Sequence, residues 1–215
     1  MSAAAHREEF IHRFAPGRPG TKRTLLLLHG TGGDERDLEP LGTLLDPDAA
    51  QLAPRGAVLE NGMPRFFRRL SEGVFDLEDL RERTHDLAEF IRLAATRYGF
   101  DPGSVVAVGF SNGANIAASL VLLHPGVLAG AVLLSPMVPF QPESGTDLAG
   151  VPVFIGAGRA DTIARPEQAE RLAELLREHG ARVTPHWHPG GHGIDRTTVS
   201  AARDWLATSV PDSRR

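Results

Sequence analysis

A repeated alternation between short apolar runs and segments with helical periodicity constrains this chain more than any other feature. Continuous apolar runs of the kind buried on both faces of a parallel sheet cover residues 24–28, 105–110, 128–134 and 151–155. Shorter strand-like segments occur at residues 9–14, 50–53 and 182–187. Strands that alternate with helices are typical of a mostly parallel sheet with helices on both faces. The pattern therefore predicts an α/β fold with about seven strands.

The helical segments between these strands begin and end at ordinary boundary signals. Apolar residues recur at helical spacing from Leu87 to Tyr98, and Gly99 follows them as a stop signal. Pro166 suits the first turn of a later helix, which Gly180 ends. Further helices are expected over residues 37–45, over residues 113–123 and around residues 199–206. Residues 54–75 show no clean period, so no element is predicted there.

The length of 215 residues fits a single domain, which we expect to span residues 1–210, with residues 211–215 as a loose tail. No apolar stretch approaches the ~18–20 residues that a membrane span needs. The chain has no cysteine, and its first residues lack the apolar core of a secretory signal. A thiol nucleophile and a disulfide framework are therefore excluded, and we expect a cytoplasmic protein.

The charge pattern bears on the partner. The formal net charge is −4 at pH 7, and the charges are spread evenly along the chain. A nucleic-acid partner is disfavoured, because binding to phosphates needs a concentrated basic surface.

The strongest chemical signal is the motif Gly109-Phe110-Ser111-Asn112-Gly113, which lies between a predicted strand and a predicted helix. A nucleophilic serine needs such a sharp turn, and a Cβ at either glycine would crowd the neighbouring strand and helix. The start of the helix also directs free N–H groups at the charge that develops in the reaction. We predict that Ser111 is a nucleophile; a glycine-rich turn without a chemical role is the alternative.

A serine hydroxyl needs a base, and the base needs a carboxylate to orient it, in the chain order Ser…Asp…His. Asp161 follows the apolar run at residues 151–155, and His192 follows the strand-like segment at residues 182–187. Both are therefore expected beside Ser111 at the carboxyl edge of the sheet, where ligands bind in open α/β sheets. A turn aspartate and a surface-loop histidine are the alternatives.

A second glycine-rich turn, with the sequence His-Gly-Thr-Gly-Gly, covers residues 29–33. Such a turn can present a backbone N–H group to an oxyanion, and a tetrahedral intermediate needs two such donors. We predict that Thr31 supplies one donor and that Asn112, the residue after the nucleophile, supplies the other. His29 is expected to brace the turn by hydrogen bonding.

Metal and cofactor chemistry have little support in the sequence. His186 and His188 could face the same side of a strand and bind zinc together with a third ligand. No third ligand follows them except His192, which the serine mechanism explains better. We therefore expect neither a metal nor an organic cofactor.

Taken together, the turns at residues 29–33 and 109–113, Asp161 and the pair Gly191-His192 resemble the phospholipase/carboxylesterase family of α/β-hydrolases. This family includes small bacterial carboxylesterases and acyl-protein thioesterases, and the resemblance covers essentially the whole chain. It implies an α/β-hydrolase fold and a serine carboxylesterase. The chain has Asn112 where the thioesterases usually have glutamine and Thr31 where they usually have leucine, which favours the bacterial carboxylesterase branch.

The segment at residues 54–80 is the only part of the chain that a core strand or helix does not claim, so no large lid domain is expected. We predict an open pocket for small, short-chain esters, with Phe66, Phe67 or Phe75 against the acyl or alcohol group. Core packing of these rings is the alternative. A narrower hypothesis is that Arg65 and Arg68 admit acidic esters.

The sequence therefore predicts a carboxylesterase that acts on a small-molecule ester through an acyl-enzyme. A thioesterase of the acyl-protein or acyl-CoA type is one alternative, and a catalytically silent small-molecule binder is another. Hydrolases of this shape frequently dimerise, so a homodimer is a further hypothesis, although no residue pattern identifies an interface.

Overall fold

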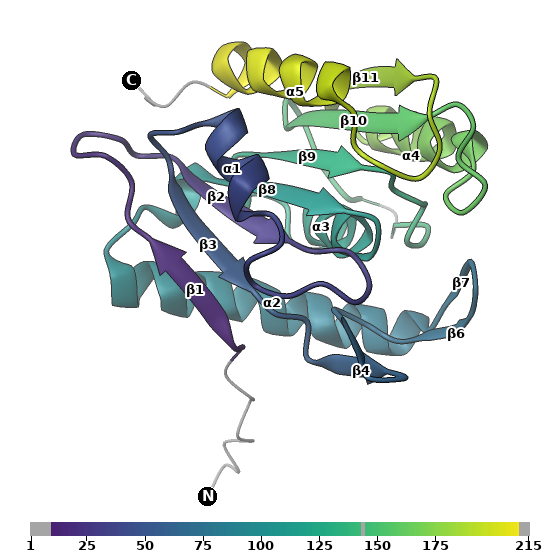
Figure 1. Cartoon of the computed structure of the whole chain (residues 1–215), viewed down its shortest axis with the longest axis horizontal. Helices are drawn as coiled ribbons and strands as arrows, with labels where there is room; N and C mark the ends of the chain where they lie inside the picture. Colours follow the sequence, from purple (N-terminus) through teal and green to yellow (C-terminus); the bar gives the residue numbers. More distant parts are fainter. Residues whose placement is uncertain (1–9, 143–144, 211–215) are drawn as a thin grey trace, which may run out of the picture.

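A seven-stranded sheet forms the centre of the computed structural model, which describes residues 10–142 and 145–210 (Figure 1). The strand order is β1-β3-β2-β8-β9-β10-β11, in which only β1 (His12–Ala15) runs antiparallel to its neighbour, β3 (Ala50–Pro54). The parallel strands besides β3 are β2 (Thr24–Leu28), β8 (Val105–Phe110), β9 (Gly130–Leu134), β10 (Pro152–Gly158) and β11 (Arg182–His188). The predicted α/β fold with a mostly parallel sheet is confirmed.

Among the described residues, five α-helices cover the two faces of the sheet. The helices α2 (Leu77–Tyr98), α3 (Asn112–Leu123) and α4 (Pro166–Glu178) lie on one face, and α1 (Glu39–Leu45) and α5 (Arg196–Ser209) lie on the other (Figure 1). A short 3₁₀ helix, η1 (Pro102–Ser104), precedes β8.

The apolar runs predicted a sheet buried on both sides, and the strand side chains alternate between two separate cores. In β2, Leu26 and Leu28 join the core under α2, α3 and α4, whereas Leu25 and Leu27 join the core under α1 and α5. Because successive residues of a strand point to opposite faces, a continuous apolar run serves both cores at once.

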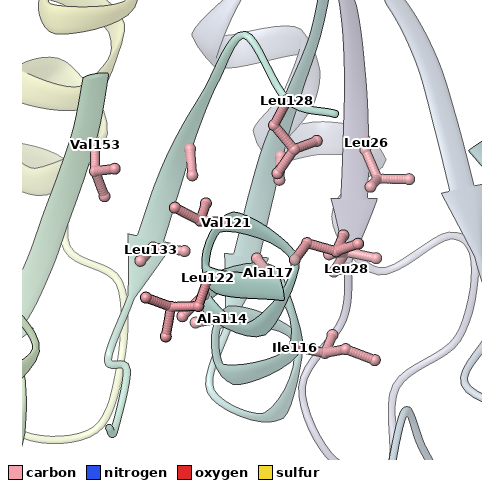
Figure 2. Packing of buried hydrophobic residues seen from close by; sticks show 14 of the residues in the cluster. Leu26, Leu28, Ala114, Ile116, Ala117, Val121, Leu122, Leu128, Leu133 and Val153 are labelled. Carbon is pink, nitrogen blue, oxygen red and sulfur yellow. The ribbon is translucent and has the colours of Figure 1, made fainter. Parts of the chain in front are cut away.

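The helix α3 is buried more completely than its neighbours. Figure 2 shows it packed beside Leu28 of β2 and Leu133 of β9, with Ala114 and Ala117 allowing a close approach. Burial of each large aliphatic side chain contributes about 1.5–3 kcal/mol. The packing therefore holds the first turn of α3 firmly at the carboxyl edge of the sheet.

Residues 54–75, for which no element was predicted, contain two short hairpins. The strands β4 (Val58–Glu60) and β5 (Met63–Arg65) form the first, and β6 (Arg69–Ser71) and β7 (Val74–Phe75) form the second. The first hairpin turns at Asn61 and Gly62, which have φ angles of 51° and 79°. An Asn-Gly pair is the usual signal for such a turn, so this hairpin was readable from the sequence.

Two sequence expectations concern residues that the structure does not describe. Residue 9 of the predicted first strand and the expected tail at residues 211–215 lie outside the described residues. Between residues 10 and 210, apart from residues 143–144, no helix has the length and apolarity to cross a bilayer.

The start of α5 makes a testable contribution to stability. The Asp195 carboxylate accepts hydrogen bonds from the Thr198 N–H at 2.8 Å and from the Thr197 hydroxyl. These bonds, chiefly that from the Thr198 N–H, lower the pKa of Asp195 to about 2. A depressed carboxyl pKa stabilises the fold above the unfolded pKa, and the contribution is lost as the pH falls through the folded pKa.

We therefore expect Asp195→Ala to lower the free energy of unfolding at pH 7 by about 1 kcal/mol, the usual effect of losing a helix cap. The difference from the wild type should shrink as the pH falls from 3.8 toward about 2. Urea unfolding at pH 7 measures the loss of stability, and urea unfolding between pH 3.8 and about 2 measures how the difference shrinks. Asp204→Ala, at an exposed position on the same helix, is the matched control, and an equal loss in both variants would contradict the capping role.

Candidate active site

Ser111 lies between β8 and α3 in a strained backbone conformation, with φ 54° and ψ −114°. The glycines on either side are required by close approach. A Cβ on Gly109 would lie 2.4 Å from the Gly113 carbonyl oxygen, and a Cβ on Gly113 would lie 1.9 Å from the Leu28 carbonyl oxygen. Backbone strain of this kind persists where the surrounding structure enforces it, and it presents the Ser111 side chain at the edge of the sheet.

The structure brings Ser111, His192 and Asp161 together from three separate loops. The His192 Nε2 lies 2.9 Å from the Ser111 Oγ, and the His192 Nδ1 lies 2.8 Å from the Asp161 Oδ2. Since a carboxylate oxygen only accepts, the Nδ1 donates to it, and the Nε2 is free to accept the serine proton. This geometry is that of a base poised to activate a hydroxyl nucleophile.

Asp161 is itself fixed by the backbone. It is 3% exposed, and its Oδ1 accepts hydrogen bonds from the Ile163 N–H at 2.8 Å and the Ala164 N–H at 2.9 Å. The other carboxylate oxygen, Oδ2, is therefore the one directed at His192.

Thr31 and Asn112 line the same cavity as Ser111. Within the part of the chain that the structure describes, the backbone N–H groups of Thr31 and Asn112 donate no hydrogen bond. Asn112 is the first residue of α3, where N–H groups have no partner inside the helix. Two free N–H groups beside one hydroxyl can bind a developing oxyanion.

His29 lies outside this group and supports the turn at residues 29–33, as expected from the sequence. Its Nε2 accepts from the Gly56 N–H at 2.9 Å, so its Nδ1 donates to the Gly30 carbonyl at 2.7 Å. Burial lowers the pKa of His29, which favours this neutral form.

The cavity at the serine has a volume of about 350 Å³. Its lining residues are Gly30, Thr31, Arg65, Arg69, Glu72, Gly73, Phe75, Phe110, Ser111, Asn112, Asn115, Met137, Ile163 and His192. Of the three aromatic residues predicted to form the pocket wall, only Phe75 lines the cavity.

Phe66 and Phe67 correct the prediction, because both are buried in the core at 1% and 0% exposure. The Phe66 ring packs 4.7 Å from the His29 ring, and the Phe67 ring lies edge-on behind Phe75 at 5.1 Å. The alternative of core packing therefore holds for these two residues.

The two arginines that were predicted to act together lie apart. Arg68 pairs with Asp76 at 3.1 Å, at the start of α2, and its side chain is 59% exposed and not part of the cavity wall. Arg69 lines the cavity beside Arg65 instead, and both contact Glu60, at 2.9 Å and 3.2 Å. Burial lowers the pKa of the Arg65 guanidinium.

Asn115, Met137 and Ile163 line the cavity but were not predicted from the sequence. The Asn115 Oδ1 accepts from the Met137 N–H at 2.8 Å. A polar residue one turn into a mostly apolar helix, four residues after Ser111, was a signal for Asn115. The other two lie in loops whose course is set by tertiary contacts.

The histidine pair considered as a zinc site does not gather further ligands. The His186 Nε2 lies 3.3 Å from the Thr197 Oγ1, and the His188 Nδ1 accepts from the Gly190 N–H at 3.2 Å. Among the described residues, no group of three histidine, aspartate or glutamate side chains could hold a metal ion.

A strained Gly-x-Ser-x-Gly turn at the carboxyl edge of a seven-stranded, mostly parallel sheet, with helices on both faces, defines an α/β-hydrolase. The model of the Dienelactone hydrolase family matches residues 62–206, and the chain belongs to this family of α/β-hydrolases. The α/β-hydrolase resemblance seen in the sequence is thereby confirmed.

Individual relatives support the same class. MhqD of Bacillus subtilis (strain 168) is 53% identical over 186 residues, which cover 86% of this chain and 93% of that protein. The crystal structure of the Bacillus cereus carboxylesterase has a TM-score of 0.90 at 50% identity, covering 92% of this chain and 93% of that one. A carboxylesterase from Mesorhizobium loti has a TM-score of 0.87 at 36% identity, covering 93% and 95%. The protein is a carboxylic ester hydrolase.

Proposed function

We propose that the protein hydrolyses small, short-chain carboxylic esters through a Ser111-His192-Asp161 triad. Ser111 Oγ attacks the ester carbonyl carbon while its proton passes to His192 Nε2. The Asp161 carboxylate keeps the proton of His192 on Nδ1 and stabilises the imidazolium that forms. The backbone N–H groups of Thr31 and Asn112 bind the oxyanion of the tetrahedral intermediate.

The rest of the reaction takes two stages, which are release of the alcohol and hydrolysis of the acyl-enzyme. The bond to the alcohol breaks, and His192 gives its proton to the departing alkoxide, which leaves an acyl group on Ser111. A water molecule attacks the acyl-enzyme as its proton passes to His192, and the carboxylic acid leaves as the proton returns to Ser111. No step needs a metal or an organic cofactor.

The observation that carries this proposal is the chain of two hydrogen bonds from Ser111 Oγ through His192 to Asp161, at 2.9 Å and 2.8 Å. A structural hydrogen-bond network has no need for a serine with φ 54° at the end of a strand. Two of the similar structures are of carboxylesterases, which supports ester hydrolysis as the reaction.

The size and polarity of the cavity support short substrates. Its volume of about 350 Å³ is near the lower end of the usual range for small-molecule sites. Arg65, Arg69, Glu72 and Asn115 in its wall offer little apolar surface to a long alkyl chain. Methylene groups beyond the cavity would stay in water and add no binding energy.

We therefore expect kcat/KM for p-nitrophenyl acetate and butyrate to exceed that for octanoate and palmitate by at least about tenfold, the effect of roughly 1.4 kcal/mol. The esters are compared below their micelle-forming concentrations. Matched acetyl and butyryl thioesters separate ester from thioester hydrolysis in the same assay. A kcat/KM that rises with chain length would overturn the short-chain assignment.

The homodimer and the cytoplasmic location expected from the sequence stay predictions. Light scattering during size-exclusion chromatography measures the first, and fractionation of the source cells measures the second.

A further inference from the structure

Arg65 and Phe66, two neighbouring residues at the end of β5, contact both halves of the proposed oxyanion hole. The Arg65 Nη1 donates a hydrogen bond to the Thr31 Oγ1 at 2.6 Å. The Phe66 N–H donates to the Asn112 Oδ1 at 2.7 Å. One short segment thus links the two residues whose backbone N–H groups would bind the oxyanion in the proposed mechanism, although these residues lie far apart in the sequence.

The turn that carries Thr31 needs such support, because glycine lies on both sides of it. Glycine has more backbone freedom than any other residue, and Gly32 has a φ angle of 84°. The Gly32 N–H donates to the Pro64 carbonyl at 2.9 Å, and His29 holds the Gly30 carbonyl at 2.7 Å. Since the Gly30 carbonyl and the Thr31 N–H belong to one planar peptide, anchoring the turn fixes the direction of that N–H.

Arg65 is itself held rigidly. Its side chain is 4% exposed, its Nε donates to the Phe67 carbonyl at 3.2 Å, and its guanidinium lies 5.7 Å from the Phe67 ring centroid. The Glu60 carboxylate lies 3.2 Å from the same Nε. A buried charge is tolerated only where it is paired and hydrogen-bonded, so these contacts leave the guanidinium little freedom.

We propose that Arg65 is a positioning residue that fixes the Thr31 peptide and keeps the two oxyanion donors at their working separation. The inference rests on the proposed function, and it assigns a role to the β4–β5 hairpin, which the sequence left unassigned. Arg65 acts through Thr31 and takes no part in bond making. A preorganised donor pair stabilises the transition state more than the ground state, so its effect falls on kcat and not on KM.

The test replaces Arg65 by Met, which keeps much of the length and removes the donors. Arg68→Met is the matched control, because Arg68 lies in the same segment and pairs with Asp76 at 3.1 Å but does not line the cavity. The substrate is neutral p-nitrophenyl acetate. The inhibitor is a neutral aryl trifluoromethyl ketone, whose adduct with the serine carries an oxyanion.

For Arg65→Met we expect kcat to fall about 10- to 100-fold with little change in KM, since outright loss of one donor costs about 10²–10³-fold. The inhibition constant of the ketone should rise by the same factor. Arg65→Lys should recover part of both effects, and Arg68→Met should change neither by more than about threefold.

A second variant covers the case in which Arg65→Met does not fold. Thr31→Val removes the hydroxyl that accepts the Arg65 hydrogen bond and keeps the backbone N–H. We expect Thr31→Val to raise the inhibition constant of the ketone by a similar factor. The double variant should raise it little more than either single variant, because both substitutions remove the same contact.

Two results would overturn the proposal. One is an Arg65→Met variant with wild-type kcat and ketone inhibition that loses activity only on an ester with a carboxylate, such as p-nitrophenyl hemisuccinate; Arg65 would then bind substrate. The other is Thr31→Val with wild-type ketone inhibition. Failure of the proposed function looks different: a fluorophosphonate would not label Ser111 in the folded wild type, and the inference would fall with it.

Discussion

Ser111→Ala should abolish ester hydrolysis, with kcat for p-nitrophenyl butyrate falling by roughly a millionfold, as when the nucleophile of a serine hydrolase is removed. Without the Oγ no acyl-enzyme can form, and the His192 Nε2, 2.9 Å from that oxygen, has no proton to accept. Steady-state release of p-nitrophenol measures the loss. The Tm should change little, because the Ser111 side chain makes no other hydrogen bond within the described part of the chain.

Ser119→Ala is the matched control for this experiment. Ser119 lies in α3, the helix that Ser111 precedes. It is fully buried and donates to the Asn115 carbonyl at 2.9 Å, but it does not line the cavity. Its loss should leave kcat near that of the wild type. Residual activity of Ser111→Ala above about a hundredth of the wild type would show that another group is the nucleophile. Mass spectrometry after fluorophosphonate treatment would then locate that group.

The central strands were predictable because burial on both faces leaves a continuous apolar run. The predicted bounds of β2 and β8, at residues 24–28 and 105–110, are confirmed. The prediction began β9 at residue 128, whereas the strand begins at Gly130. Leu128 is buried but lies before the ladder, so burial alone did not mark the strand boundary.

The two hairpins between β3 and α2 lack the continuous apolar run that marks the core strands, and the sequence signals the first of them by its turn at Asn61 and Gly62 alone. Each hairpin is short. Ion pairs such as that of Arg69 with Glu60 stabilise the hairpins, whereas apolar contacts stabilise the core strands. The segment after β5 also leaves the strand conformation at Phe66 and Phe67, and both rings turn inward. If the strand had continued, its alternation would have placed the two rings on opposite faces. The sequence therefore could not show that both rings are buried and that neither lines the cavity.

The proposed triad was predictable because each residue directly follows a recognisable strand. The chain order then assigned one role to each of Ser111, Asp161 and His192. The partner of Thr31 was not predictable, since Arg65 reaches it across 34 residues of sequence. A contact of this kind depends on how the β4–β5 hairpin docks, which no local pattern encodes.

Asp161→Asn should lower kcat about 10⁴-fold while leaving the fold intact. The backbone N–H groups of Ile163 and Ala164 donate to Oδ1 at 2.8 Å and 2.9 Å, so the amide oxygen of an asparagine must take that position. The amide NH₂ group of the asparagine then replaces Oδ2. In the wild type, Oδ2 lies 2.8 Å from the His192 Nδ1. A donor at that place forces the imidazole proton onto Nε2, on the side that faces Ser111. The protonated Nε2 can no longer accept the serine proton.

The expected result is a loss of kcat for p-nitrophenyl butyrate with a Tm close to that of the wild type, since the two backbone hydrogen bonds remain. Asp195→Asn is the control, because Asp195 also accepts a hydrogen bond from the backbone N–H three residues later, at 2.8 Å, whereas the carboxylate that contacts His192 is that of Asp161. It should keep most of the activity. If Asp161→Asn instead stays within about tenfold of the wild type, the carboxylate does not set the tautomer of His192, and Asp161 serves only to hold its own loop.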